Sequence, residues 1–339
     1  MNNDPREWGF WTEVKLDALD RYLTRFTTAS QRSPTTLYLD LFAGSVDNVR
    51  RDDNTRHFTG STVRAIETIP QFTHLRFFEL PQKARQLRNE LSARFPNDER
   101  YAVMEGDCNT TISTTLHDLQ AQGLSFAPTL CFIDPDGLDV GWSTLSALAS
   151  FKDRRTRTKP EILILLSHTT IPRLAGWDLS MGLDEKLSLS VTRFYGTQSW
   201  RRIHERRMHH ALNASDARSL YTALLRYRIQ YVLGYSRTLT IEMGNERGAP
   251  VYVLIFATDH EAGVRIMSSV FSEAREQSAE YRAEVTERRQ RDNRQQAGTP
   301  TLFDISNDVS IMQLLYFEST QIDDAPMLPT WLMKPQGDA

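Results

Sequence analysis

Four acidic side chains stand at or just after the ends of short apolar segments of the sequence, in a repeating pattern. The four are Asp40, Glu79, Asp107 and Asp134. In an open α/β sheet, ligands bind beyond the carboxyl ends of the strands, near the point where the strand order reverses. If the apolar segments are parallel strands of one sheet, the four carboxylates meet at one edge. There they could accept hydrogen bonds from a ligand, or accept a proton from a reacting group.

The turn after the first segment is suited to close contact with a ligand. Asp40 is followed by Phe42, Ala43 and Gly44, and Gly44 lets the backbone approach a bound molecule because it has no side chain. A helix predicted to begin near Ser61 offers free N–H groups at its N-terminus. Together these groups suit an amino-acid carboxylate or a phosphate. A turn that merely ends a strand is the plainer interpretation of Gly44.

The second and third acids have positions typical of nucleoside recognition. Glu79 ends its strand, where its carboxylate can accept hydrogen bonds from both hydroxyls of a ribose. Leu80, the next residue, is also expected to contact the bound ligand. Asp107, followed by Cys108, is placed to accept a hydrogen bond from an adenine amino group. An acid after a strand is also a common helix cap, and that alternative stays open for Asp107.

The fourth acid is the first candidate for a catalytic base. Asp134 is followed by Pro135 and then Asp136, which could act from the other side of a substrate. His168, after the next predicted strand, is a further candidate base, and Arg173 could bind an anionic group of a substrate. The plainer alternatives are a strand-ending turn for Asp134 and a packing role for His168.

Short apolar strands alternate with helices along the first half of the chain, which predicts a mostly parallel α/β sheet. The strands are expected at residues 36–42, 75–79, 102–105, 130–133 and 162–166, and the later helices at 82–94, 111–120 and 142–151. An amphipathic helix over residues 8–26 precedes the first strand and is expected to cover the sheet. Residues 46–59 are polar and are predicted to form a long loop.

The second half of the chain departs from this alternation. An insertion is predicted at about 170–213, and it contains a basic cluster made of Arg201, Arg202, His204, Arg206, Arg207, His209 and His210. A helix at 214–227 follows, and residues 239–243 and 251–257 form an antiparallel hairpin that closes the sheet. A helix from about 261 continues to 296 as a polar, charged stretch. The chain therefore divides into a helical lead-in at 1–35, an α/β domain at 36–275, and a charged helix with a tail at 276–339.

Composition and charge narrow the classes of protein. Hydrophobic residues make up 40% of the chain and charged residues 24%, as in an ordinary globular protein. No apolar run is long enough to span a bilayer, so the expectation is a cytoplasmic protein without a membrane partner. The net charge of −3 disfavours a dedicated nucleic-acid binder; the basic cluster is either a solvated helix face or a local surface for nucleic acid or an acidic partner. Cys108 and Cys131 lack metal-ligand spacing, so neither a metal site nor a disulfide is expected.

The order of these motifs resembles that of the class I methyltransferases, which share the strand–helix alternation and the closing antiparallel hairpin. More narrowly, the chain from about Trp11 to Ser272 resembles the three-Cys-motif partner protein family. The resemblance rests on Asp40-Leu41-Phe42-Ala43-Gly44, Gly60-Ser61, Phe78-Glu79, Gly106-Asp107-Cys108-Asn109, Phe132-Ile133-Asp134-Pro135-Asp136-Gly137, Trp142 and Arg173. It implies a Rossmann-like fold that binds S-adenosyl-L-methionine and a partner protein with a cysteine motif. It also implies that Asp134 and Pro135 lie beside the transferred methyl group, and that Trp142 and Arg173 contact the substrate.

Two departures from the family pattern bear on activity. The family usually has Gly-Pro-Gly after Phe-Ala, whereas this chain has Gly44-Ser45-Val46. Amino-group methyltransferases acting on nucleic acid have Asp-Pro-Pro-Tyr, whose ring stacks on the flipped base, whereas Asp136 and Gly137 fill the last two places here. The resemblance predicts an S-adenosylmethionine-dependent methyltransferase whose acceptor is nucleic acid or a partner-bound substrate. A binding subunit that has lost turnover is the alternative.

Two other classes of nucleotide-binding enzyme are poorly supported. The sequence has no Gly-x-x-x-x-Gly-Lys-Ser/Thr phosphate loop, which disfavours a nucleotide hydrolase. It also has no Gly-x-Gly-x-x-Gly turn after the first strand, which disfavours a dehydrogenase.

Overall fold

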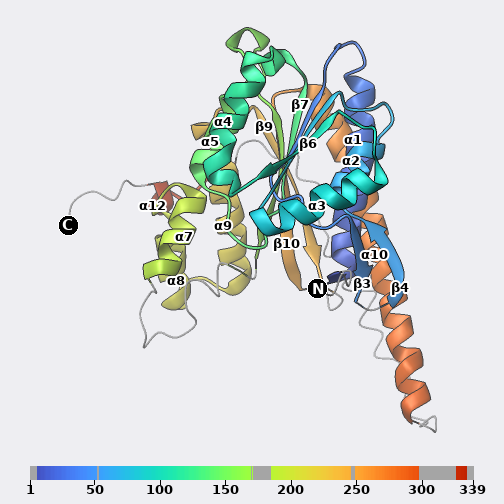
Figure 1. The fold of residues 1–339 in the computed structure, drawn as a ribbon. Helices are drawn as coiled ribbons and strands as arrows, with labels where there is room; N and C mark the ends of the chain where they lie inside the picture. The colour runs from blue at the N-terminus through green and yellow to red at the C-terminus, as the bar shows by residue number, and fades with distance from the viewer. Residues whose placement is uncertain are drawn as a thin grey trace.

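A seven-stranded sheet forms the centre of the molecule (Figure 1). The computed structural model describes residues 6–51, 53–168, 170, 185–245, 249–297 and 326–333. The strand order across the sheet is β6-β5-β2-β7-β8-β10-β9. These strands are β2 (Leu37–Asp40), β5 (His74–Glu79), β6 (Tyr101–Glu105), β7 (Thr129–Ile133), β8 (Glu161–Ser167), β9 (Arg237–Gly244) and β10 (Pro250–Thr258). All neighbouring strands are parallel except for the pairs that β10 makes with β8 and β9.

The strand order reverses beside β2. This strand pairs with β5 on one side and with β7 on the other. The chain moves outward from β2 through β5 to β6, and then continues through β7 and β8 in the opposite direction. Doubly wound sheets bind ligands at such a reversal, beyond the carboxyl ends of the strands. The predicted fold class, a Rossmann-like sheet closed by an antiparallel hairpin, is confirmed.

Helices cover both faces of the sheet, which explains why its strands are apolar on both sides. One face packs against α1 (Phe10–Ala29), α2 (Ser61–Glu67), α3 (Pro81–Arg94) and the first part of α10 (Glu261–Ala297). The other face packs against α4 (Cys108–Ala121), α5 (Trp142–Ala149) and α9 (Ala214–Tyr227). In β2, Tyr38 belongs to the first core, while Leu37 and Leu39 belong to the second. Successive side chains of each strand point to opposite faces of the sheet, so a strand such as β2 contributes to both cores.

The polar stretch at 46–59 is a hairpin and not the long loop that its composition predicts. β3 (Asp47–Arg50) pairs with β4 (Asp53–Thr59), and β1 (Arg6–Trp8) adds parallel to β3 to form a second, three-stranded sheet. Asn48, Val49 and Arg50 are buried, although two of them are polar. The groups that cover them come from distant parts of the chain, so local composition cannot indicate these strands.

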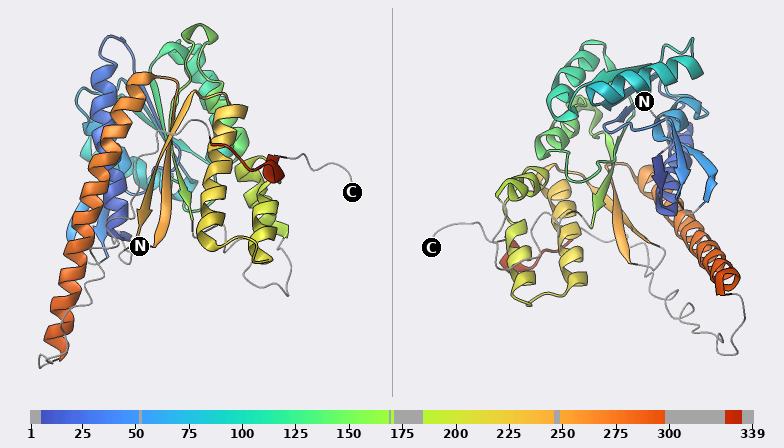
Figure 2. Two further views of the ribbon diagram at one scale, coloured as in Figure 1. Left: turned by 180° about the vertical axis from the view of Figure 1, so that it is seen from behind. Right: turned by 60° about the horizontal axis from the view of Figure 1, so that its bottom comes forward.

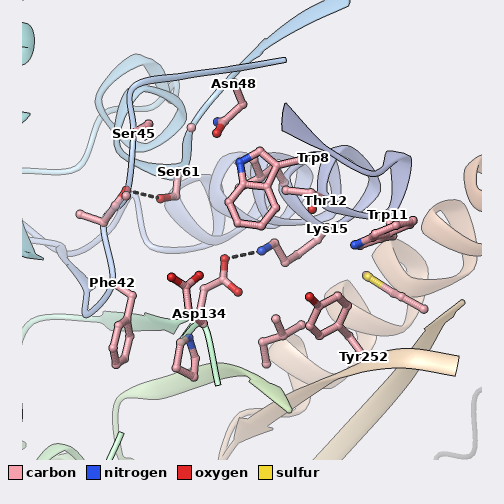
Figure 3. A pocket seen from close by; sticks show the side chains of 18 residues that line it. Trp8, Trp11, Thr12, Lys15, Phe42, Ser45, Asn48, Ser61, Asp134 and Tyr252 are labelled. Atoms are coloured by element: carbon pink, nitrogen blue, oxygen red, sulfur yellow. Dashed lines mark hydrogen bonds and ion pairs between the residues drawn. The ribbon is translucent and has the colours of Figure 1, made fainter. Parts of the chain in front are cut away.

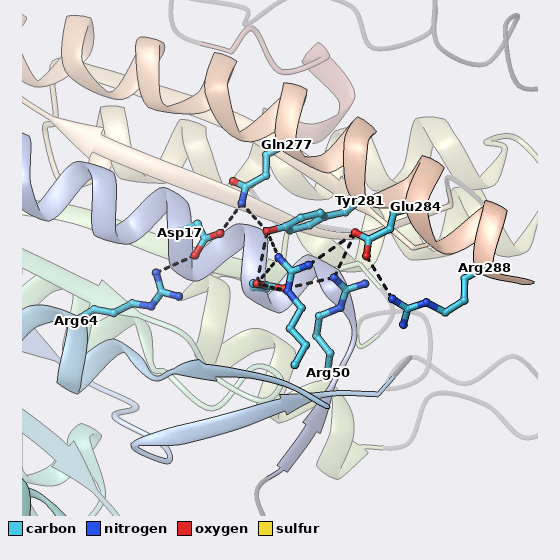
Figure 4. Close-up of polar contacts among 9 residues, drawn as sticks. Asp17, Arg50, Arg64, Gln277, Tyr281, Glu284 and Arg288 are labelled. Carbon is cyan, nitrogen blue, oxygen red and sulfur yellow. Dashed lines mark hydrogen bonds and ion pairs between the residues drawn. The ribbon is translucent and has the colours of Figure 1, made fainter. Parts of the chain in front are cut away.

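Buried charges tie the small sheet to α1 and α10 (Figure 4). Arg50, with no exposed surface, lies 3.6 Å from Glu13 of α1 and 3.9 Å from Glu284 of α10. Arg56 lies 2.9 Å from Glu13, and both arginines stack on the ring of Tyr281. We call Glu13, Arg50, Arg56, Tyr281 and Glu284 the charged cluster. It holds three elements together that are far apart in the sequence.

The predicted helical insertion contains α7 (Glu185–Tyr195) and α8 (Trp200–Met208), which lie beside α9 (Figure 1). This group and the far end of α10 stand on opposite sides of the molecule (Figure 2). Arg202 of the basic cluster donates to the Trp331 carbonyl of α12 (Thr330–Met333) at 3.1 Å, and Arg206 stacks on the Trp331 ring. These two arginines therefore pack against protein. No helix among the described residues has the length and apolar character to cross a membrane.

Candidate functional site

Two cavities open at the carboxyl edge of the sheet, one on each side of the turn that follows β2. The wider cavity has a volume of about 260 Å³ and the narrower one about 170 Å³. Both are lined by Phe42, Gly44, Asp134 and Asp136. The turn after β2 and the loop after β7 thus divide one site into two halves, at the point where the strand order reverses.

Glu79 lies in the wider cavity and anchors the turn after β2. Its Oε2 accepts a hydrogen bond from the Gly44 N–H at 3.0 Å, and its Oε1 accepts one from the Leu80 N–H at 2.9 Å. Gly44 has a φ of 65°, in the left-handed region that glycine adopts without strain. The carboxylate at the end of β5 therefore sets the path of the glycine turn.

Asp107 also lines the wider cavity, and it caps α4 as the plainer interpretation proposes. Its Oδ1 accepts hydrogen bonds from the backbone N–H of Asn109 at 2.9 Å and from the Asn109 amide at 2.8 Å. The same amide binds the carbonyl of Asp139, so it also holds the loop that leads to α5. Both bonds to Asp107 end on one oxygen, which makes capping compatible with ligand binding by the other oxygen.

The wider cavity is acidic. Its lining contains five carboxylates and two cations, namely Glu79, Asp107, Asp134, Asp136, Asp139, Lys83 and Arg193. Leu41, Phe78 and Cys108 supply apolar surface. Burial raises the pKa of the Cys108 thiol to about 12, so this side chain stays neutral. A lining with this balance of charge favours a positively charged ligand over a phosphate.

The narrower cavity is aromatic and contains an ion pair (Figure 3). Lys15 of α1 points toward Asp134 and pairs with its carboxylate. The aromatic part of the lining consists of Trp8, Trp11, Phe42 and Tyr252. Lys15 is only 8% exposed, so its ammonium group depends on Asp134 for compensation of its charge. The carboxylate at the end of β7 is therefore paired in this structure.

Asp40 lies beneath the glycine turn and lines neither cavity. It is fully buried and accepts hydrogen bonds from the Tyr38 hydroxyl and the Phe42 N–H, each at 3.3 Å. Burial raises the pKa of Asp40 to about 7, and the charge of Asp134 adds to the rise, while bonds from Ser61 and Phe42 oppose it. Asp40 thus supports the turn from below.

Asp40→Asn is expected to change how stability depends on pH. Folding raises the pKa of this carboxyl from near 4 to about 7, so its protonated form stabilises the fold at low pH. That contribution is lost as the pH rises toward 7, by about 4 kcal/mol at most. In urea denaturation, the free energy of unfolding of Asp40→Asn relative to the unmodified chain should therefore rise from about pH 4 to pH 7 and then level off. A difference that stays constant across this range would contradict the assignment.

Most residues predicted from the strand ends meet at the two cavities. They are Phe42, Ala43, Gly44, Ser61, Glu79, Leu80, Asp107, Cys108, Asp134, Pro135 and Asp136. Trp142 does not line them, because it begins α5 and packs under the guanidinium of Arg228. His168 does not either: it is buried 3.7 Å from Glu242, as its packing interpretation proposes. Arg173 lies outside the described residues.

Lys15 and three aromatic residues complete the site without belonging to any motif. Trp11, Lys15 and Leu19 are spaced by four residues, which puts Lys15 on the apolar face of α1. Because lysine is seldom buried without a partner, this position is the signal that could have indicated it. No local signal points to Trp8 or Tyr252, which reach the cavity from β1 and β10.

Comparison with known proteins adds a remote structural likeness. No family model matches the sequence, and no curated protein matches it. Among solved structures, the chain is similar to a Legionella pneumophila protein described by the family model DUF519. The two share 12% sequence identity and a TM-score of 0.38, over 76% of this chain and 92% of the other. This likeness indicates no activity and no ligand.

Proposed function

We propose that this chain is an S-adenosyl-L-methionine-dependent methyltransferase. The observation that carries the proposal is the divided site. In the wider half, Glu79 and Asp107 come from the ends of neighbouring strands; in the narrower half, Asp134 lies among aromatic rings. The halves meet at the turn of Gly44. Such a site suits a cofactor that has a nucleoside at one end and presents a reactive group to a second substrate at the other.

The wider half fits S-adenosylmethionine better than a nucleotide. The cofactor carries a positive sulfonium charge, which the acidic lining attracts. The phosphate groups of a nucleotide are negative, and the same lining would repel them. Glu79 would bind the ribose hydroxyls, and the Asp107 oxygen that does not cap α4 would bind the adenine amino group. Leu80 and Cys108 would pack against the base.

The chain's own residues would position the acceptor and take up its proton. When bound, S-adenosylmethionine supplies an electrophilic methyl group. The aromatic lining of the narrower half keeps water away and orients the acceptor, and alignment supplies much of the acceleration. Asp134 can hold a proton released by the acceptor, and Asp136, which lines both halves, is a second proton acceptor. The acceptor we propose is nucleic acid or a substrate bound to a partner protein, and the resemblance to three-Cys-motif partner proteins supports such a partner.

A binding subunit without turnover is the second candidate, and one observation favours it. The ammonium of Lys15 already neutralises Asp134, the residue best placed to take up a proton. Such a subunit would still bind the cofactor, because Glu79 and Asp107, which would hold the nucleoside, take no part in this pair. It would transfer no methyl group to any acceptor.

Calorimetric titration with S-adenosylmethionine and S-adenosylhomocysteine tests the proposal. We expect both to bind with dissociation constants in the micromolar range. Failure of both to bind would overturn the cofactor assignment. Where binding is found, transfer of a labelled methyl group to nucleic acid or to protein supports the enzyme, and its absence from every fraction supports the binding subunit.

A further inference from the structure

A third cavity lies at the opposite edge of the sheet, where the strands β7 and β8 begin. Its volume is about 300 Å³. It is bounded by the end of α1, by the segment before β8 and by the start of α10. Cavities that bind small molecules in proteins begin at about this size. This cavity shares no lining residue with the two halves of the site described above.

Basic side chains surround the cavity. They are Arg32, Lys152, Lys159 and His260. Lys159 is already engaged, because its Nζ donates to the Gly234 carbonyl at 2.7 Å and pairs with Asp259 at 3.3 Å. For the side chains of Arg32, Lys152 and His260, the described part of the chain provides no hydrogen-bond acceptor.

The acids near the cavity are engaged, in contrast to these three bases. Glu161 is buried at its floor and accepts hydrogen bonds from the Tyr22 hydroxyl at 2.6 Å and the Thr258 hydroxyl at 2.7 Å. Asp259 accepts from the Ser236 N–H at 2.8 Å, in addition to its pair with Lys159. Lys152 is therefore the partly buried base of the cavity without a hydrogen-bond acceptor in the described part of the chain, whereas Arg32 and His260 are exposed to solvent.

Burial affects two of the bases in the same direction. It lowers the pKa of Lys152 and that of His260, and the charge of Lys152 lowers the pKa of His260 further. Glu161 and Asp259 oppose the shift at Lys152, and Asp259 opposes it at His260. An anion in the cavity would compensate the charge of the Lys152 ammonium, and the His260 imidazole could donate a hydrogen bond to the same anion.

The start of α10 presents backbone to the same cavity. Ala262 and Gly263 line it, and the first N–H groups of a helix have no carbonyl partner within the helix. Gly263 packs closely against Glu161, since a Cβ there would lie 2.3 Å from Oε1 of Glu161. The helix is 37 residues long, and its N-terminus favours negative charge. Glu261, the acid of its first turn, is exposed and does not line the cavity.

We propose that this cavity binds a small phosphate monoester with an apolar body. Lys152, His260 and the start of α10 hold the dianionic phosphate, and Arg32 closes over it from the rim. Phe26 and Ile266 contact the apolar body. The site is separate from the one proposed for S-adenosylmethionine, and its existence does not depend on that proposal.

Titration calorimetry of the full chain with phenyl phosphate tests the inference, with phenol as the probe that lacks the anion. Phenyl phosphate should bind and phenol should bind far more weakly. Lys152→Met should weaken the affinity for phenyl phosphate about tenfold or more, as loss of a charge-assisted hydrogen bond does. Arg155→Met is the matched control: it removes a positive charge from the same segment, but Arg155 is paired with Asp153 and lies outside the cavity.

Two outcomes would overturn the assignment. One is an absence of phenyl phosphate binding at millimolar concentration; the other is equal affinity of the unmodified chain and the Lys152→Met variant. Arg32→Gln, at an exposed position, gives a second variant whose folding is not in question. It should weaken binding in the same direction, and unchanged affinity would remove Arg32 from the site.

Discussion

Glu79→Ala is expected to weaken the binding of S-adenosylmethionine about a hundredfold, because two hydrogen bonds to a charged group are lost together. Under the proposed function, the Glu79 carboxylate accepts hydrogen bonds from the ribose hydroxyls. It also accepts the Gly44 N–H at 3.0 Å, so its removal loosens the glycine turn between the two cavities. Calorimetric titration of the variant measures the loss directly.

Two further variants test whether the loss of affinity comes from the lost ribose contacts or only from the removal of a negative charge. Glu105 lies opposite Glu79 in the β5–β6 register, but it pairs with Arg85 and Arg88 outside the cavities. Glu105→Ala should therefore leave the affinity unchanged. Glu79→Gln keeps one acceptor oxygen and should give an intermediate affinity. If Glu79→Ala bound the cofactor as tightly as the unmodified chain, the ribose assignment would be wrong.

Arg50→Met is expected to lower the free energy of unfolding by about 3–5 kcal/mol, as loss of one partner from a buried ion pair does. Arg50 is fully buried within the charged cluster, between Glu13 and Glu284. Removing its guanidinium leaves Glu13 buried, with Arg56 as its remaining cation within the cluster. Urea denaturation, followed by circular dichroism, gives the change in the free energy of unfolding.

The control variants test whether the loss of stability comes from the weaker compensation of the Glu13 charge. Glu13→Leu combined with Arg50→Met removes both charges and should recover part of the stability, because a buried ion pair can be replaced by apolar groups at little cost. Arg291→Met breaks an exposed pair with Glu287 and should change the free energy of unfolding by less than about 0.5 kcal/mol. A double variant less stable than Arg50→Met alone would argue against this account.

The central sheet could be predicted because its signals are local. Each strand is a short apolar run, and both faces of β2 are buried by helices that the sequence also indicates. The position of the acids follows from the same information, because parallel strands bring their carboxyl ends to one edge. Asp107 shows the limit at an element boundary: α4 begins at Cys108, earlier than its apolar spacing predicts, because Asp107 caps it.

The small sheet and half of the site could not be predicted in this way. The segment 46–59 has the composition of a loop, and it forms strands only because β1, α1 and α10 supply partners for Asn48 and Arg50. Lys15, Trp8 and Tyr252 reach the narrower cavity from three elements that are remote from Asp134 in sequence. Such contacts carry no periodicity, so a pattern within one segment does not reveal them.

The helix α1, which carries Lys15, is synthesised long before α10, the helix that it packs against. Asp17 of α1 and its partner Gln277 of α10 are 260 residues apart, and Arg25 and Glu273 are 248 residues apart. At the usual speed of translation, α1 stays without these partners for on the order of tens of seconds. During that time the side of α1 that packs against α10 stays uncovered. A ribosome that stops early releases a product in which the cavity around Lys15 and Asp134 lacks the helix that fixes α1 in place.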